Sequence, residues 1–229
     1  MCYNISISVF ILFTQMKPKK GTLFSARVVI GMTTDVLQKL SQLRALLQSS
    51  RLPFWKELPE IDLYMDQVIV LSEKYLGAFF PEDTKKPLTP AIVNNYVKMG
   101  VIPSPNKKRY TREHLARLFM ICILKQVLSV SASGALLADE LKRRPIDQVY
   151  DRFCETQAAL AARTLDLTEQ ELMHWEEDGG SLEMAIALRA NLEKMLAERL
   201  LPVLMPTEPE PSKKKLKETN ELTAEAESQ

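Results

Sequence analysis

Apolar residues recur at helical spacing over most of the chain, and Gly and Pro separate the periodic stretches. Between residues 35 and 48 the apolar positions are spaced by four, three and four residues, which predicts an amphipathic helix. The same reasoning predicts further helices over approximately residues 62–78, 89–99, 111–128, 131–141, 146–165, 168–179 and 181–201. We therefore expect a mainly α fold.

Several predicted helix ends carry residues that suit them. Thr89 is a suitable N-cap, and Pro90 suits the first helical turn, where its missing N–H costs nothing. Gly100 stands where a helix commonly ends in a left-handed conformation. Thr168 opens a capping-box sequence, which predicts that a separate helix begins there, and Pro202 is expected to end the last helix.

Residues 103–110 join two of these helices with two prolines and a basic run, which predicts two very short extended arms around a polar turn. Thr111 is expected to cap the following helix, and Tyr96 and Tyr110 are interpreted as core residues rather than as platforms for bases. The order of helices and arms predicts a winged helix-turn-helix with a small β wing, followed by a C-terminal helical module.

Composition places the chain among ordinary globular proteins. It has 229 residues, of which 46% are hydrophobic and 26% charged, and seven glycines are too few for a nucleotide-binding α/β fold with several phosphate turns. The three cysteines lie far apart without a metal-binding spacing, and Cys122 falls on an apolar helical stripe, so a reducing cytoplasm is expected. The apolar run at residues 5–13 is too short to span a bilayer, and its basic residues follow it, so no membrane partner is expected.

Charge is distributed unevenly along the chain. Residues 85–125 contain nine Lys or Arg and one acid, Glu113, whereas residues 155–183 contain eight acids and one basic residue, Arg163. A dense basic segment beside a helix is typical of proteins that bind double-stranded DNA. The alternative is a protein–protein adaptor whose basic domain docks an acidic partner, which could be segment 155–183 of its own chain.

The candidate DNA contacts lie on helix 89–99, in the wing and in the first turn of the next helix. An exposed Asn suits adenine in the major groove, Lys suits guanine or phosphate, and basic wing residues suit phosphates. The last two candidates lie near backbone N–H groups that favour phosphate, and the histidine is expected at the surface. The candidates are Asn94, Asn95, Lys98, Lys107, Lys108, Arg109, Arg112 and His114.

No catalytic motif is visible. The chain lacks a phosphate-binding G-x-x-x-x-G-K-(S/T) loop, a G-x-S-x-G nucleophile turn and an H-E-x-x-H zinc helix, and it has two histidines. We therefore expect no enzyme activity, no cofactor and no metal site.

The wing region resembles a known pattern. Tyr96, Gly100 followed by Val101 and Ile102, and Arg109-Tyr110 stand in the order found in the DNA-binding domain of MerR-type regulators. The stretches at 62–67 and 124–129 resemble more closely a bacterial family titled domain of unknown function 1836, and the likeness covers roughly residues 54–165. Two departures are the longer loop at 79–88 and Asn95 where an Arg often precedes the tyrosine.

The resemblance implies a sequence-specific DNA-binding transcription regulator. Such regulators pair to read two half-sites, so helices 146–165 and 181–201 are expected to form a homodimer, and the resemblance leaves room for a small-molecule effector of unknown identity. Residues 1–31 are interpreted as a poorly ordered arm or as the result of a start codon assigned too far upstream. The expected divisions are 1–31, an N-terminal helix at 32–53, the winged domain at 54–145, the helical module at 146–205 and a disordered tail at 206–229.

Overall fold

The computed structural model describes residues 23–80, 86–178 and 181–204. Within these ranges the chain forms seven α-helices and two short 3-10 helices. The α-helices are α2 (Leu23–Ser49), α3 (Met65–Leu76), α4 (Pro90–Lys98), α5 (Arg112–Leu124), α6 (Val130–Arg143), α7 (Ile146–Asp178) and α8 (Leu182–Leu204). The 3-10 helices are η1 (Trp55–Glu57) and η2 (Gly77–Phe79). The mainly helical prediction is confirmed, while the expectations for residues 1–22 and for the tail from residue 206 fall outside the described ranges.

The helices belong to two compact units. One contains α2 and residues 157–178 of α7, and the other contains residues 51–156 together with α8. In the first unit, Arg44 on α2 pairs with Asp166 at 2.8 Å and with Glu169 at 3.0 Å. Leu165 and Leu172 of α7 are buried within the same unit.

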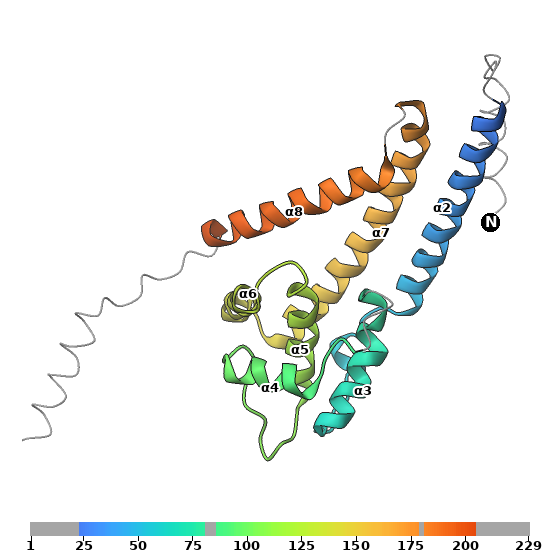
Figure 1. Ribbon diagram of the computed structural model, residues 1–229. Coiled ribbons are helices and arrows are strands. Elements are labelled where there is room, and N and C mark those ends of the chain that lie inside the picture. The colour runs from blue at the N-terminus through green and yellow to red at the C-terminus, as the bar shows by residue number, and fades with distance from the viewer. Residues whose placement is uncertain (1–22, 81–85, 179–180, 205–229) are drawn as a thin grey trace, which may run out of the picture. The chain divides into compact units, whose positions relative to one another are not determined.

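The second unit is organised around α5. Eight of its thirteen residues are buried, including Leu115, Leu118, Phe119 and Cys122. A helix with so many buried residues must be covered on several sides, and α3, α4 and α6 gather near it in Figure 1. Cys122 is a core residue, as the sequence predicted, and burial raises the pKa of its thiol to about 12.

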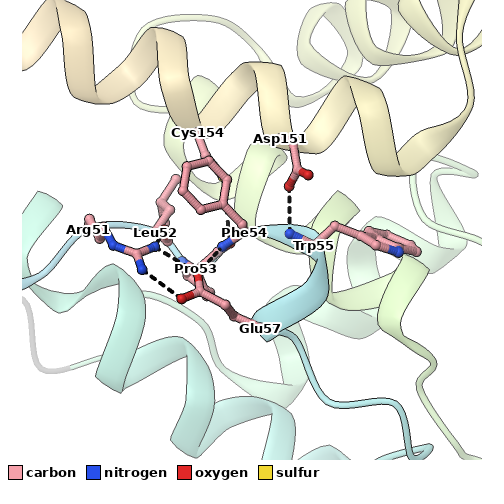
Figure 2. A network of polar contacts seen from close by, with 8 residues as sticks. All are labelled: Arg51, Leu52, Pro53, Phe54, Trp55, Glu57, Asp151 and Cys154. Carbon is pink, nitrogen blue, oxygen red and sulfur yellow. Dashed lines mark hydrogen bonds and ion pairs between the residues drawn. The ribbon is translucent and has the colours of Figure 1, made fainter.

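A polar network fastens the start of this unit to α7 (Figure 2). Arg51 binds both carboxylate oxygens of Glu57, at 2.7 and 2.6 Å, and Glu57 also accepts from the backbone N–H of Phe54. The Arg51 hydrogen bonds hold the pKa of Glu57 down at about 2. These bonds close one turn of the chain, and the backbone N–H of Trp55 donates to Asp151 on α7 at 2.6 Å.

Four helix boundaries differ from the prediction. α7 continues through Thr168, so the separate helix predicted there is wrong. The Thr168 hydroxyl donates to the Thr164 carbonyl at 2.8 Å inside the helix, and a Thr used in this way does not cap a new one. α2 begins at Leu23, before the predicted start near residue 35, and α5 ends at Leu124, before the predicted 128. Pro202 lies within the last turn of α8, where it removes a single helical hydrogen bond.

The expected β wing is absent from the described part of the chain. Residues 100–110 form a loop with isolated bridges, Asn106 to Arg109 and Leu63 to Tyr110, and no strand. The physical reason is that Pro103 and Pro105 have no N–H to donate, so the first arm cannot build a ladder. We refer to residues 100–110 as the wing loop.

Two other features of the helices bear on partners. Apolar side chains on α8 are about half exposed or more: Met184, Leu188, Leu192, Leu196, Leu200 and Val203. None of the helices in the described ranges has the length and apolar content needed to cross a membrane.

Candidate nucleic-acid interface

Helix α4 begins and ends as its sequence predicts. The Thr89 side chain accepts from the backbone N–H of Ile92 at 3.3 Å, and Pro90 occupies the first turn. Val93 and Tyr96 are buried, and burial raises the pKa of Tyr96 to about 12. The opposite side of the helix is left to solvent, and it carries the polar candidates.

The three polar candidates on α4 share that exposed side. Asn94, Asn95 and Lys98 are all exposed. Lys98 follows the two asparagines by four and three residues, spacings that make side chains neighbours on a helix surface. The Asn95 amide lies 3.5 Å from the sulfur of Met99, a weak contact that leaves the amide accessible. This face therefore presents two amides and an ammonium group to solvent.

The chain leaves α4 through a left-handed turn. Gly100 has φ of 70°, a conformation that glycine adopts without steric cost, as its position predicted. The backbone N–H groups of Val101 and Ile102 both donate to the Tyr96 carbonyl, at 3.0 and 3.3 Å. Ile102 is buried, so the wing loop starts from a fixed point against the core.

The tip of the wing loop is strained. Lys107 and Lys108 have φ of 49° and 63°, and the Arg109 N–H donates to the Asn106 carbonyl at 2.9 Å. Positive φ at both central residues is the pattern of a type I′ turn, which favours Asn and Gly. A lysine in this region costs about 1 kcal/mol relative to glycine. The protein thus keeps two exposed ammonium groups where uncharged residues fit the backbone better.

Ion pairs distinguish some basic residues of the segment 85–125 from others. Lys86 pairs with Glu73 at 3.0 Å, Arg112 with Glu60 at 3.2 Å and Arg117 with Glu113 at 2.7 Å. Within the described ranges, Lys98, Lys107, Lys108 and Arg109 form no ion pair. All four are exposed, so their charge remains available to a partner.

Arg112 differs from the other candidates because its side chain is only 18% exposed. Its guanidinium carbon lies 5.5 Å from the centre of the Trp55 ring, and its Nε donates to the Pro59 carbonyl at 3.4 Å. With Glu60 these contacts form one wall of a shallow pocket of about 390 Å³. Arg112 therefore fastens the segment before α3 to the start of α5.

His114 was expected at the surface, and that expectation is wrong. The ring is 7% exposed, and its Nδ1 accepts from the backbone N–H of Thr111 at 3.1 Å, which closes the first turn of α5. The ring also packs edge-on against Tyr110, with 5.6 Å between centroids. Burial lowers the pKa of His114, which favours the neutral form of the ring. The sequence could have indicated this role, because a residue three positions after a Thr cap can close a capping box.

Tyr64 is a surface residue that no local sequence pattern marks as a site. It is 51% exposed, the Arg109 guanidinium lies 4.7 Å from its ring centre, and Arg109 donates to its hydroxyl at 2.9 Å. Its place beside the wing loop depends on a pairing between residues 47 positions apart, Leu63 and Tyr110, which no local pattern reveals.

One comparison with known proteins gives a match. Residues 53–153, less than half of the chain, match the family model described as Domain of unknown function (DUF1836). The matched part extends from η1 to the first turns of α7 and includes α4 and the wing loop. No curated protein and no solved structure matches the chain.

Proposed function

We propose that this protein binds double-stranded DNA through α4 and the wing loop, and that it acts as a sequence-specific transcription regulator. The observation that carries the proposal is a set of four exposed cations that form no ion pair with any residue the structure describes: Lys98, Lys107, Lys108 and Arg109. Cations that form no internal pair are available to replace the counterions of a phosphate backbone. Such a role implies a cytoplasmic protein.

In this proposal the two parts of the interface have different tasks. Asn94, Asn95 and Lys98 lie on one exposed side of a short capped helix and would meet base edges in the major groove. Lys107, Lys108 and Arg109 would hold phosphates. The order α3, α4, wing loop, α5 supports a MerR-like helix-turn-helix in which a tight loop takes the place of a stranded wing.

Salt dependence tests this function directly. We expect labelled duplexes of genomic sequence to shift fluorescence anisotropy at low salt, with a log–log slope of about −3 per protomer for three phosphate contacts. Replacing Lys107 and Lys108 together by Ala should weaken binding and flatten the slope by about 2. The charge-matched control is the double replacement of Lys74 and Lys142, two exposed lysines outside the wing loop, by Ala.

Two results of these measurements would contradict the proposal. Absence of binding at low salt, or equal effects of the two double replacements, would contradict the DNA proposal. Specificity is tested by footprinting on fragments that are bound, followed by replacement of Asn94 and Asn95 by Ala. That change should reduce the difference between specific and random duplexes while leaving the salt slope in place.

We further propose that α8 pairs with α8 of a second copy. Five of its exposed apolar side chains recur every four residues from Met184 to Leu200, along one side of the helix. An exposed apolar stripe of this kind commonly marks an interaction site. Replacing Leu192 and Leu196 by Gln should convert a dimer to a monomer in sedimentation equilibrium. Val127→Gln, an exposed apolar position outside α8, is the control.

The second candidate function is a protein–protein adaptor, and the same exposed face of α8 favours it. In that case the four unpaired cations would dock an acidic protein. Recovery of an acidic partner by a tagged wild-type chain, lost on replacing Lys107 and Lys108, together with no DNA affinity at low salt, would support the adaptor over the regulator.

A further inference from the structure

Tyr64 and Arg109 are brought together by backbone pairing. Leu63 and Tyr110 exchange two hydrogen bonds, N–H to carbonyl, at 2.9 and 2.8 Å in an antiparallel bridge. Because Tyr64 follows one bridge residue and Arg109 precedes the other in an antiparallel bridge, the two residues lie opposite each other. Their proximity is therefore imposed by the fold and does not depend on a chance encounter of two long side chains.

The two side chains make a double contact. The Arg109 guanidinium carbon lies 4.7 Å from the Tyr64 ring centre, and its Nη2 donates to the Tyr64 hydroxyl oxygen at 2.9 Å. The ring limits the rotamers open to the arginine, so less conformational entropy is lost when the guanidinium meets a ligand. Both residues are exposed, so a ligand reaches them from solvent.

The free hydrogen-bond donors of Tyr64 and Arg109 define which ligands the pair can bind. The Tyr64 oxygen accepts from Arg109, which leaves the phenolic hydrogen free to donate elsewhere. Arg109 has five N–H groups, of which one is used here, and it forms no ion pair with a carboxylate in the described ranges. The site therefore offers one neutral and several charged donors and a positive charge, which suits an oxyanion such as phosphate.

We propose that Tyr64 and Arg109 together form a binding site for a backbone phosphate of DNA, with the Tyr64 hydroxyl as a direct donor. The proposal rests on the DNA-binding function above and adds to it Tyr64, the N-cap residue of α3. It places one phosphate contact at the start of α3, which precedes both α4 and the wing loop in the chain order.

Removing the Tyr64 hydroxyl distinguishes a role in binding phosphate from a role in positioning Arg109. Stacking needs only the ring, so Tyr64→Phe keeps the contact with the guanidinium and removes the donor. Tyr75→Phe is the control, since Tyr75 lies within α3 and the ammonium group of Lys74 lies 4.9 Å from the centre of its ring. Eleven residues along a helix place Tyr75 about 16 Å from the Tyr64 position.

The experiment is a double-mutant cycle on the full chain, read by anisotropy with a labelled duplex over a salt series. Tyr64→Phe should weaken DNA binding roughly three- to tenfold with an unchanged salt slope, because a neutral donor is lost. Arg109→Ala should flatten the slope by about 0.9, because one charge is lost. In the Arg109→Ala background, Tyr64→Phe should have less than half of its effect on affinity, because the two residues share one phosphate.

Each outcome has a separate meaning. If wild type binds DNA and depends on Lys107 and Lys108, but Tyr64→Phe binds like Tyr75→Phe, this inference is overturned and the proposed function stands. If wild type fails to bind at low salt, the proposed function fails and the inference fails with it. If inorganic phosphate at millimolar concentration shifts the Arg109 Nε–H resonance without DNA, and Tyr64→Phe abolishes that shift while leaving DNA affinity unchanged, the site takes free phosphate and the assignment to the backbone is wrong.

Discussion

Val101 packs directly against Gly134 of α6, so closely that a Cβ added to Gly134 would lie 2.9 Å from Val101 Cγ1. Val101 is the first residue of the wing loop after Gly100, whose left-handed turn directs it toward α6. The missing side chain at position 134 thus sets how near the loop lies to α6. The position of the wing loop is fixed by helix packing as well as by its own hydrogen bonds.

We predict that Gly134→Ala destabilises the protein despite improving helix propensity. The gain in propensity is about 1 kcal/mol, whereas forcing a methyl group into a filled contact costs about 1–3 kcal/mol. Urea unfolding should show a net loss of about 1 kcal/mol, recovered in part by adding Val101→Ala. Gly77→Ala is the control, since nothing lies within 4 Å of its added Cβ and its backbone is helical. Equal stability of the two single variants would contradict the packing argument.

A second prediction concerns the strained tip of the wing loop. Replacing Lys107 by Asn and Lys108 by Gly creates the residue pair that a type I′ turn prefers. Relief of strain should raise stability by about 1–2 kcal/mol, seen as a Tm several degrees higher. The same change removes two charges and should weaken DNA binding at low salt. A rise in Tm without loss of binding would show that these lysines do not contact the partner.

The third prediction concerns the pH dependence that His114 confers. Because burial lowers its pKa in the folded state, the unfolded chain takes up a proton first as the pH falls below about 6.5. Stability should therefore be level above pH 7 and should decrease between pH 6.5 and 5. Protonation would also end the role of Nδ1 as acceptor for the Thr111 N–H.

His114→Gln tests this assignment, because a Gln at that position can still close a capping box but does not titrate. Its Tm should change less between pH 7 and 5 than that of wild type. The chain has two histidines, so the same measurement on His174→Gln separates the contribution of the other imidazole. A His114→Gln profile that parallels wild type would assign the pH dependence to other groups.

The fourth prediction concerns the bond between Trp55 and Asp151. Asp151→Ala leaves the Trp55 N–H without its acceptor at 2.6 Å and should cost about 1–3 kcal/mol in urea unfolding. Asp151→Asn keeps an acceptor oxygen and should cost less than half as much. If both variants unfold like wild type, the network of Figure 2 contributes nothing measurable to stability.

Local sequence patterns were sufficient to predict the secondary structure around the candidate interface. Helical spacing and caps located α4 between Thr89 and Gly100, because a Thr hydroxyl, a Pro in the first turn and a left-handed Gly each satisfy a backbone requirement that depends only on near neighbours. Counting charged residues located the basic segment, because net charge along the chain also depends on the sequence alone. The two failures have different reasons. At Thr168 a capping sequence lies inside a continuing helix, whereas in the wing loop two prolines, themselves a local signal, prevent the predicted strands.

What the chain by itself determined is which residues are helical and which carry charge in the region 85–125. Only the tertiary structure decided which of those charges remain unpaired, since Arg112 is drawn to Glu60 and Trp55 while Lys107 and Lys108 are left at a strained tip. It also decided that His114 is buried and that Tyr64 lies beside Arg109. The physical reason is that burial and ion pairing depend on segments distant in sequence, whereas caps, spacing and net charge do not.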